Sequence, residues 1–343
     1  MNKSIFDITY RTVLAVIMTV VVTAAYAGDS SPAYNFLNIP SSTTSYGLGG
    51  INITNIYDDV NNIDQNPALL GPEYHHQIGL NYMHYVGGSN FGGARFAMRG
   101  SERSAWAAGI QYFGYGNIQG ADAEGNFTDT FSPKDLTVNV MYSHDITDRL
   151  RGGINLKWVY SNYEQYTAMA LATDLGINYY DPDHDLSLSV VVANLGGQIK
   201  RFNEEYDRLP VDVRLGWAQS FGSLPLRFSV TAWNLTKWSL PYYHTGDNTT
   251  ELGLKQSFGS NLFRHLIFGV DYIASSNFHI GIGYNYKTRT DMSTYHRSFL
   301  SGLSLGMGIK AGRFGVGAAV AQPHTGATTF MVNLSMALSD FTN

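Results

Sequence analysis

The segment FHIGIGYNYK (Phe278–Lys287) decides the fold, because its apolar and polar residues alternate with a period of two. One face carries Phe278, Ile280, Ile282, Tyr284 and Tyr286, and the other carries His279, Gly281, Gly283, Asn285 and Lys287. Alternation of this kind is typical of a β-strand whose two faces have different surroundings. A row of large apolar residues opposite small and polar ones indicates a strand between lipid and a polar interior.

The same alternation recurs along most of the chain, for example in LRGGINLKWVY (150–160) and SGLSLGMGIK (301–310). The pattern predicts fourteen strands, near residues 76–86, 91–99, 104–113, 136–144, 149–160, 168–180, 185–195, 211–221, 226–235, 265–273, 278–287, 299–310, 313–321 and 328–338. Their lengths lie around the roughly 9–11 residues that a tilted membrane strand needs. We therefore predict an all-β fold, a fourteen-stranded transmembrane antiparallel β-barrel.

The lengths of the connections support this prediction. If the N-terminus is periplasmic, the short turns fall on the periplasmic side, at 100–103, 145–148, 181–184, 222–225, 274–277 and 311–312. The long connections, 114–135, 196–210 and 236–264, then all lie outside. Short turns inside and long loops outside are the bacterial outer-membrane pattern. The segment 250–258 alternates poorly, and we assign it to a loop, because a fifteenth strand would break the even count.

The composition agrees with a barrel. Charged residues make up 14% of the 343 residues, against about 25% in a typical soluble domain. The formal net charge of −5 argues against a nucleic-acid surface, which is normally basic. The absence of cysteine excludes disulfides, thiol nucleophiles and cysteine metal sites. A soluble β-sandwich would also alternate, but the polar opposite faces and the loop asymmetry favour the barrel.

The N-terminus has the features of a signal peptide. Lys3 and Arg11 precede an apolar run over 13–25, and Ala25-Tyr26-Ala27 forms an A-x-A cleavage site. The run is too short to span a bilayer as a helix. We expect residues 1–27 to be a signal peptide cleaved after Ala27, residues 28–75 to form a hatch or plug, and residues 76–343 to form an outer-membrane barrel.

The stretch NPALL (66–70) supplies the expected hatch motif. Pro67 fixes its own φ angle and pushes Asn66 out of the helical region, so the chain turns there. We expect this motif to pin a plug to the inner barrel wall through five residues, Asn66, Pro67, Ala68, Leu69 and Leu70. A cap over the periplasmic end is the alternative, because a cap would share this chemistry.

The sequence offers no catalytic constellation. It contains no S-x-x-K, H-E-x-x-H, G-x-S-x-G or phosphate-loop motif. The adjacent pair His75-His76 starts a strand, where neighbouring side chains point to opposite faces and do not easily share a metal. We expect no catalytic residue, no metal site and no cofactor. We expect His265 and His279 to face the lumen and to hydrogen-bond hatch groups.

Parts of the sequence resemble a known family of proteins. NPALL shortly before the first strand resembles the N-terminal motif of FadL-like outer-membrane barrels, which have fourteen strands and an N-terminal hatch. Two longer blocks, 34–88 and 263–287, resemble the PorV/PorQ family within that class. The first block carries FLNIP, GLGG, DDV and NPALL in the family's order. Members of this family belong to the type IX secretion system of Bacteroidota.

The resemblance implies a non-enzymatic function in protein secretion. A PorQ-like protein is implied to anchor a PorZ-like partner within the attachment complex that includes PorU and PorV. That complex attaches secreted proteins to lipopolysaccharide at the outer-membrane surface. A PorV-like shuttle for secreted substrates and a FadL-like transporter of hydrophobic small molecules remain alternatives. Lumen-facing Gly, Ser, Asn, Thr and Lys favour the anchor, because such a transporter needs an apolar lumenal pocket and a lateral gap.

The long outer loops are the expected partner-binding sites, because loops on a rigid scaffold commonly carry binding. Their aromatic residues suit the core of an interface. The candidates are Tyr115, Phe127, Phe131, Phe202, Tyr206, Trp238, Tyr242 and Tyr243.

Overall fold

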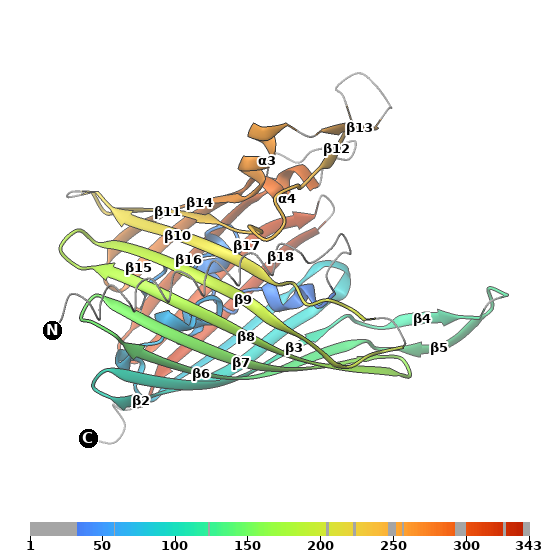
Figure 1. Ribbon diagram of the computed structural model, residues 1–343, viewed down its shortest axis with the longest axis horizontal. Coiled ribbons are helices and arrows are strands. Elements are labelled where there is room, and N and C mark those ends of the chain that lie inside the picture. Colours follow the sequence, from blue (N-terminus) through green and yellow to red (C-terminus); the bar gives the residue numbers. More distant parts are fainter. Residues whose placement is uncertain are drawn as a thin grey trace, which may run out of the picture.

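Fourteen antiparallel strands form a closed barrel in the computed structural model of the chain (Figure 1). The structure describes residues 33–57, 59–122, 124–203, 206–221, 224–245, 252–255, 257–291, 300–324 and 327–338. The barrel strands are β1 Gln77–His84, β2 Asn90–Ser101, β3 Ser104–Gly114, β6 Lys134–Asp145, β7 Leu150–Tyr163, β8 Tyr166–Asp181, β9 Leu186–Lys200, β10 Asp212–Ser220, β11 Leu226–Ala232, β14 Leu266–Ser275, β15 Phe278–Asn285, β16 Leu303–Ala311, β17 Phe314–His324 and β18 Ala327–Ala337. The predicted fourteen-stranded barrel is confirmed. The expected signal peptide lies outside the described residues.

The barrel is closed by its first and last strands. Each strand pairs with its neighbour in the chain, and β1 pairs with β18 from Gln77 opposite Ala337 to His84 opposite Phe330. This pairing leaves no free edge in the wall.

The two faces of the strands have the expected surroundings. In β15, Ile282 points outward and is 54% exposed, whereas the neighbouring Gly281 and Gly283 are buried. In β18, Phe330 and Val332 are exposed, and Met331 and Asn333 are buried. The large apolar residues therefore face lipid, and the small and polar residues face the lumen.

Several strand ends differ from the prediction. The strand predicted at 185–195 continues to Lys200, and the one predicted at 299–310 begins at Leu303. The pattern predicts a strand to Lys287, but β15 ends at Asn285 and the helix α4 (Tyr286–Asp291) follows. The side-chain oxygen of Asn285 accepts a hydrogen bond from the backbone N–H of Thr288, at 3.1 Å. A side-chain acceptor at this position favours a helix start over continued pairing.

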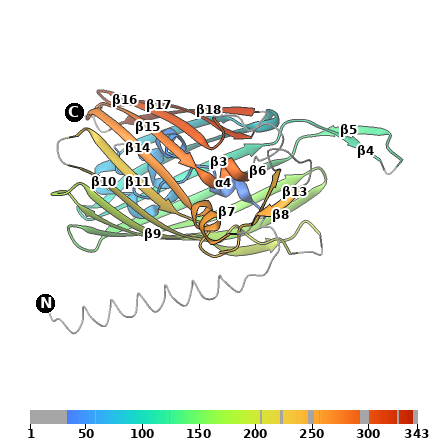
Figure 2. The same ribbon diagram turned by 90° about the horizontal axis from the view of Figure 1, so that it is seen from above.

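Two short hairpins project from the outer loops, and neither belongs to the barrel (Figures 1 and 2). One consists of β4 (Ile118–Ala121) and β5 (Phe127–Phe131), and the other of β12 (Tyr242–Thr245) and β13 (Leu252–Lys255). The assignment of 250–258 to a loop is thus wrong for β13. The parity argument holds, because β13 pairs with β12 outside the barrel wall. The helix α3 (Phe258–Arg264) follows β13.

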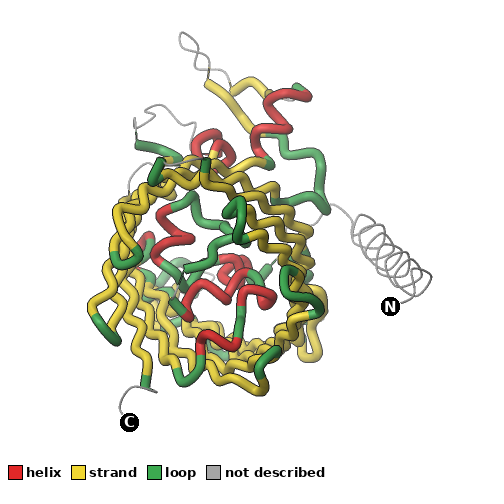
Figure 3. Tube along the Cα trace, turned by 90° about the vertical axis from the view of Figure 1, so that its left-hand side faces the viewer, coloured by secondary structure: helices red, strands yellow, loops and turns green. Residues whose placement is uncertain are grey.

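The segment before β1 lies inside the barrel, where its short helices are seen within the ring of strands (Figure 3). We call residues 33–74 the hatch. It consists of α2 (Thr43–Gly47) and short 3₁₀ helices, which are η1 Asn35–Asn38, η2 Val60–Gln65, η3 Pro67–Leu69 and η4 Pro72–Tyr74, and a further 3₁₀ turn, η5 Val86–Gly88, follows β1. Within the described residues, no helix has both the length and the apolar character needed to cross a membrane.

Apolar hatch residues pack into small lumenal clusters. Val60, Ile63, Leu69, Leu70 and Tyr74 pack against alanines of β2 and β3 and against Met141 of β6. A second cluster joins Ile51 and Ile53 to β9 and β14. The small wall residues bring the hatch close to the strands, so backbone and polar groups come within hydrogen-bond distance.

Candidate functional site

The NPALL motif forms a capped turn. The side-chain oxygen of Asn66 accepts a hydrogen bond from the Ala68 N–H at 3.0 Å and so caps η3, with Pro67 in its first turn. The Asn66 side-chain N–H groups donate to the Ile53 carbonyl oxygen at 2.8 Å and to Ser189 Oγ of β9 at 3.2 Å. One buried amide thus fixes the turn, holds another hatch segment and reaches the wall.

The motif lies directly on the inner wall. Pro67 and Ala68 lie over Gly153 of β7 and Gly176 of β8, where an added Cβ atom would approach hatch atoms to within 2.6 Å. The Leu70 carbonyl oxygen accepts a hydrogen bond from Ser143 Oγ of β6 at 2.6 Å. The motif therefore contacts the wall from β6 to β9 inside the barrel.

A buried ion pair fastens the next part of the hatch. Arg95 of β2 pairs with Asp64 at 3.1 Å, and both side chains are largely buried. Gln111 of β3 donates to the same carboxylate at 2.8 Å and to Ser41 Oγ at 2.9 Å. This group joins two hatch segments to two neighbouring strands.

A second polar group connects the hatch to β7, β8, β9 and β10. Lys157 of β7 pairs with Asp174 of β8 at 2.7 Å and also donates to the side-chain oxygen of Asn194 of β9 at 2.9 Å. Asn38 joins the hatch to this group. Its side-chain oxygen accepts a hydrogen bond from the Asn194 side chain at 3.2 Å and another from Arg214 of β10 at 2.6 Å.

The turn η2 lies at the seam between β1 and β18. The Asp59 carboxylate accepts hydrogen bonds from the Asn61 backbone and side chain, at 3.0 and 2.9 Å, and from the side chain of Asn333 on β18. Asn333 also accepts a hydrogen bond from the hydroxyl of Thr43. Burial raises the pKa of the Asp59 carboxyl, although these hydrogen bonds oppose the shift.

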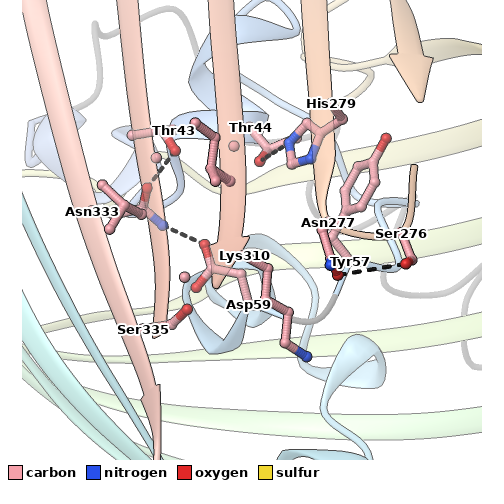
Figure 4. A pocket seen from close by; sticks show the side chains of 15 residues that line it. Thr43, Thr44, Tyr57, Asp59, Ser276, Asn277, His279, Lys310, Asn333 and Ser335 are labelled. Carbon is pink, nitrogen blue, oxygen red and sulfur yellow. Dashed lines mark hydrogen bonds between the residues drawn. The ribbon is translucent and has the colours of Figure 1, made fainter. Parts of the chain in front are cut away.

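A small recess of about 60 Å³ lies between the hatch and the periplasmic ends of β15 to β18 (Figure 4). Tyr57 stacks on His279 with ring centroids 4.3 Å apart, and His279 Nε2 lies 3.1 Å from Thr44 Oγ1. The Arg227 guanidinium lies 5.6 Å from the centre of the Tyr57 ring. His279 thus contacts the hatch, as its position in the strand predicts.

The expectation for His265 is wrong. Its ring nitrogens lie 2.8 and 2.9 Å from the carbonyl oxygens of Trp233 and Trp238, both in the outer loop. His265 is the C-terminal cap residue of α3 and precedes β14, so its side chain organises the loop instead of the hatch.

A larger recess, with a cavity volume of about 220 Å³, opens on the outer side of the hatch. Its floor includes Tyr46 and Gly49 of the hatch, and its wall includes Tyr85, Trp233 and Asn285. Aromatic rings and amides of this kind can bind an uncharged molecule by stacking and hydrogen bonds.

The expected loop residues separate into groups. Tyr115 and Phe202 belong to an aromatic cluster around Tyr163 of β7, with ring centroids at 5.6 and 4.9 Å from the Tyr163 ring. The Tyr115 hydroxyl also donates to Asp135 of β6 at 2.6 Å. These two residues are half-buried and pack against the outer end of β7.

The β4–β5 hairpin holds the most exposed aromatic candidate. Phe127 is 83% exposed, and Phe131 on the same strand is half-buried. Tyr206 is also exposed, with Arg201 lying over its ring at 5.4 Å. Phe127 and Tyr206 therefore remain available for a partner.

The last three candidates lie around the β12–β13 hairpin. Trp238 is exposed, whereas Tyr242 is only 7% exposed because Arg264 covers its ring at 4.7 Å. Tyr242 is therefore unsuited to direct contact with a partner. Tyr243 lies in β12, and its side chain is outside the described part of the structure.

Sequence reasoning identified the motif at 66–70 and missed Asn38, Asp64 and Arg95. A signal existed for Arg95, which lies on the lumenal face of a predicted strand, where a buried charge requires a partner. Among the described residues, no group of three or more His, Asp or Glu side chains comes together as a metal site.

Comparisons with known proteins find similarity in structure but not in sequence. No protein-family model matches the chain, and no curated protein matches it by sequence. The Pseudomonas putida toluene transporter TodX is similar in structure, with a TM-score of 0.54, 11% identity, and coverage of 87% of this chain and 97% of that one. The CymD monoaromatic hydrocarbon channel has a TM-score of 0.52 and 12% identity, and the match covers 89% of this chain and 99% of that one. A Pseudomonas aeruginosa FadL homologue has a TM-score of 0.48 and 12% identity, and the match covers 87% of this chain and 98% of that one.

The fold and the internal hatch thus define a class, the outer-membrane β-barrels. Within that class, the chain has the fold of FadL-type barrels. The similar structures are transporters and channels, not enzymes.

Proposed function

We propose that this chain is a plugged outer-membrane scaffold that holds a protein partner at the cell surface. The observation that carries the proposal is the fastening of the hatch around the wall. Four hatch residues form hydrogen bonds or an ion pair with the wall. They are Asn38, Asp59, Asp64 and Asn66, and their partners lie on β2, β3, β9, β10 and β18. A hydrogen bond to a charged group contributes about 1.5–3 kcal/mol. Removing the hatch breaks several such contacts together, which suits a permanent plug better than a gate.

The β4–β5 hairpin supports the presence of a partner. It extends away from the barrel as an isolated two-stranded ribbon (Figures 1 and 2). Such a ribbon is marginally stable alone, and its open edges can pair with another chain. The connection 115–133 carries Asp122, Glu124 and Asp129 and no lysine or arginine. We therefore expect the partner to present a basic rim around an apolar pocket for Phe127.

The sequence resemblance supports a finer proposal, a PorQ-like anchor for a PorZ-like protein in the attachment complex with PorU and PorV. The block 34–88 that carries the resemblance also supplies Asn38, Asp59 and Asn66, which fasten the hatch. The barrel would sit in outer-membrane lipid and lipopolysaccharide, with the loops exposed outside. A PorV-like shuttle would use the same surface for secreted substrates.

A FadL-like transporter of hydrophobic small molecules is the second candidate. The recess of about 220 Å³ above the hatch favours it, as do the names of the similar structures, a toluene transporter and a monoaromatic hydrocarbon channel. The polar fastening below the recess argues against passage through the barrel, because a ligand would have to displace the hatch.

Affinity purification from outer membranes of the native host tests the anchor. In one variant a tight turn replaces residues 117–132, which removes the β4–β5 hairpin. A matched variant shortens the β12–β13 hairpin. Both variants should assemble, as judged by heat-modifiable migration in a detergent gel. Only the first should lose a PorZ-like partner. Retention of the partner by that variant overturns the proposed docking site, and recovery of secreted cargo instead favours the shuttle.

Ligand binding tests the transporter directly. Toluene added to the purified barrel should leave the melting temperature unchanged if the chain is only a scaffold. A saturable increase that disappears in Trp233→Ala would establish a hydrophobic ligand site in the recess and favour the second candidate.

A further inference from the structure

One lobe of the outer loops lies to the side of the barrel. It comprises the described residues between β11 and β14, including β12, β13 and α3, and we call it the lateral lobe. In the side view it rises beyond the outer ends of β11 and β14 (Figure 1). In the view along the barrel it lies outside the ring of strands (Figure 3). The lobe therefore extends over the membrane that surrounds the barrel, and not over the lumen.

The helix α3 in this lobe has its polar side buried and its apolar side exposed. Asn261 and Arg264 are 8% and 2% exposed. Phe258 and Phe263 are 72% and 49% exposed. A helix on the surface of a water-soluble protein has the opposite arrangement, with the apolar side packed inward. The reversed arrangement is expected where the outer surroundings are apolar.

Specific contacts hold α3 in this orientation. Asn261 accepts a hydrogen bond from the Leu240 N–H at 2.8 Å and donates to the Trp238 carbonyl oxygen. Arg264 pairs with Asp291 of α4 and lies over the Tyr242 ring. Rotating the helix to bury its phenylalanines would leave a charge and an amide without these partners. The exposed side is thus fixed by the structure.

The exposed side of α3 continues the lipid-facing surface of the wall. Phe263 packs on Phe268 of β14 with ring centroids 6.4 Å apart, and on Tyr286 at 6.1 Å. Phe268 shares the outward face of β14 with Tyr272, which is exposed. Trp238 packs against Phe258 with ring centroids 6.1 Å apart, and it stacks on His265, just before β14, at 4.8 Å.

We infer that the lateral lobe is a membrane anchor, in which Trp238, Phe258 and Phe263 insert into the outer leaflet at the border of headgroups and acyl chains. Lipid is the occupant because the aromatic row is continuous with a surface that already faces lipid. Aromatic side chains are also favoured at this depth of a membrane. The anchor would fix the height and rotation of the outer loops relative to the lipid surface.

Spin labelling tests the inference, and the cysteine-free sequence makes single labels straightforward. Phe258→Cys and Phe263→Cys are labelled in lipid nanodiscs that contain only this protein. Ile282→Cys on the lipid-facing wall and Phe127→Cys on the β4–β5 hairpin serve as the lipid and water references. We expect labels at 258 and 263 to be at least tenfold less accessible to a water-soluble nickel chelate than the label at 127. Their accessibility to oxygen should approach that at 282.

Equal access of the nickel chelate to positions 258, 263 and 127 would overturn the inference. Because no other protein is present, protection in the nanodisc has to come from lipid. If the cysteine variants do not assemble, Trp238 and Trp238→Phe proteins are compared in lipids with brominated acyl chains, after the exposed wall residues Trp106 and Trp158 have been replaced by phenylalanine in both. A quenched component of the fluorescence that is present with Trp238 and lost in Trp238→Phe supports insertion, and equal quenching in both overturns it.

Discussion

Gly153 of β7 and Pro67 of the hatch are in direct backbone contact, because a Cβ atom at position 153 would lie 2.4 Å from the carbonyl group of Pro67. The backbone of Pro67 cannot move without disturbing the capped turn that Asn66 holds. We therefore expect Gly153→Val to displace residues 66–70 from the wall. Overpacking of this kind costs about 1–3 kcal/mol. Ion conductance in planar bilayers and proteolysis of the hatch should both increase.

Gly152 supplies the matched control. A Cβ atom there would meet only the end of the Ile146 side chain, at 3.3 Å, and this side chain can move. Gly152→Val should leave conductance and proteolysis unchanged. Equal effects of the two substitutions would show that valine disturbs β7 itself and would contradict the contact with the hatch.

The buried pair of Arg95 and Asp64 should make a large contribution to stability. Arg95→Ala leaves the Asp64 carboxylate buried with only neutral donors, and loss of one member of a buried pair costs about 3–5 kcal/mol. The melting temperature of the heat-modifiable form should fall strongly. Arg103 and Asp148 form a similar pair at 3.2 Å on the surface, so Arg103→Ala should have little effect. A small effect of Arg95→Ala would mean that water reaches the pair.

Docking of the hatch should depend on pH through Asp59. Burial raises the pKa of this carboxyl in the docked state, whereas a released hatch would have the ordinary value of about 3.9. The docked state therefore binds the proton more tightly, and docking weakens as the pH rises from the ordinary pKa through the raised one. Hydrogen exchange of the hatch amides should quicken over that window. The pH dependence of this exchange should be reduced in Asp59→Asn. An unchanged pH dependence in that variant would show that another titrating group causes it.

The amide of Asn66 has two separable functions. Asn66→Ser keeps a side-chain oxygen that can cap η3 but loses the amide donors to Ile53 and Ser189. Asn66→Ala loses all three contacts. Loss of a cap costs about 1 kcal/mol, and an unpaired buried group costs about 1–3 kcal/mol. Hydrogen exchange at Leu69 and Leu70 should therefore be faster in Asn66→Ala than in Asn66→Ser. The opposite order would contradict a capping function.

The sequence predicts the strands well, because a membrane barrel imposes a period of two on every segment that crosses lipid. The end of β15 is harder to predict, since Asn285 suits both a lumenal strand position and the start of α4. The hairpin of β12 and β13 was missed because no membrane imposes a pattern on an outer loop. Leu252 and Leu254 alternate with Gly253 and Lys255, but four residues are too few to separate from chance.

The fastening of the hatch is only partly readable from the sequence. Pro67 marks the turn, because its effect on the backbone is local. The partners of Asn38 and Asp64 depend on the path of several short 3₁₀ turns and on the register of distant strands. Arg95 and Asp64 are brought together by folding alone, and no local period relates them.

The position of η2 has a consequence for the closure of the barrel. Asn61 approaches Gly79 of β1 and donates to the Leu334 carbonyl oxygen of β18 at 3.4 Å, while Asp59 binds Asn333 of the same strand. η2 thus contacts, from inside the barrel, both the first and the last strand of the wall. It therefore links the two ends of the sheet independently of the hydrogen bonds that β1 and β18 make with each other.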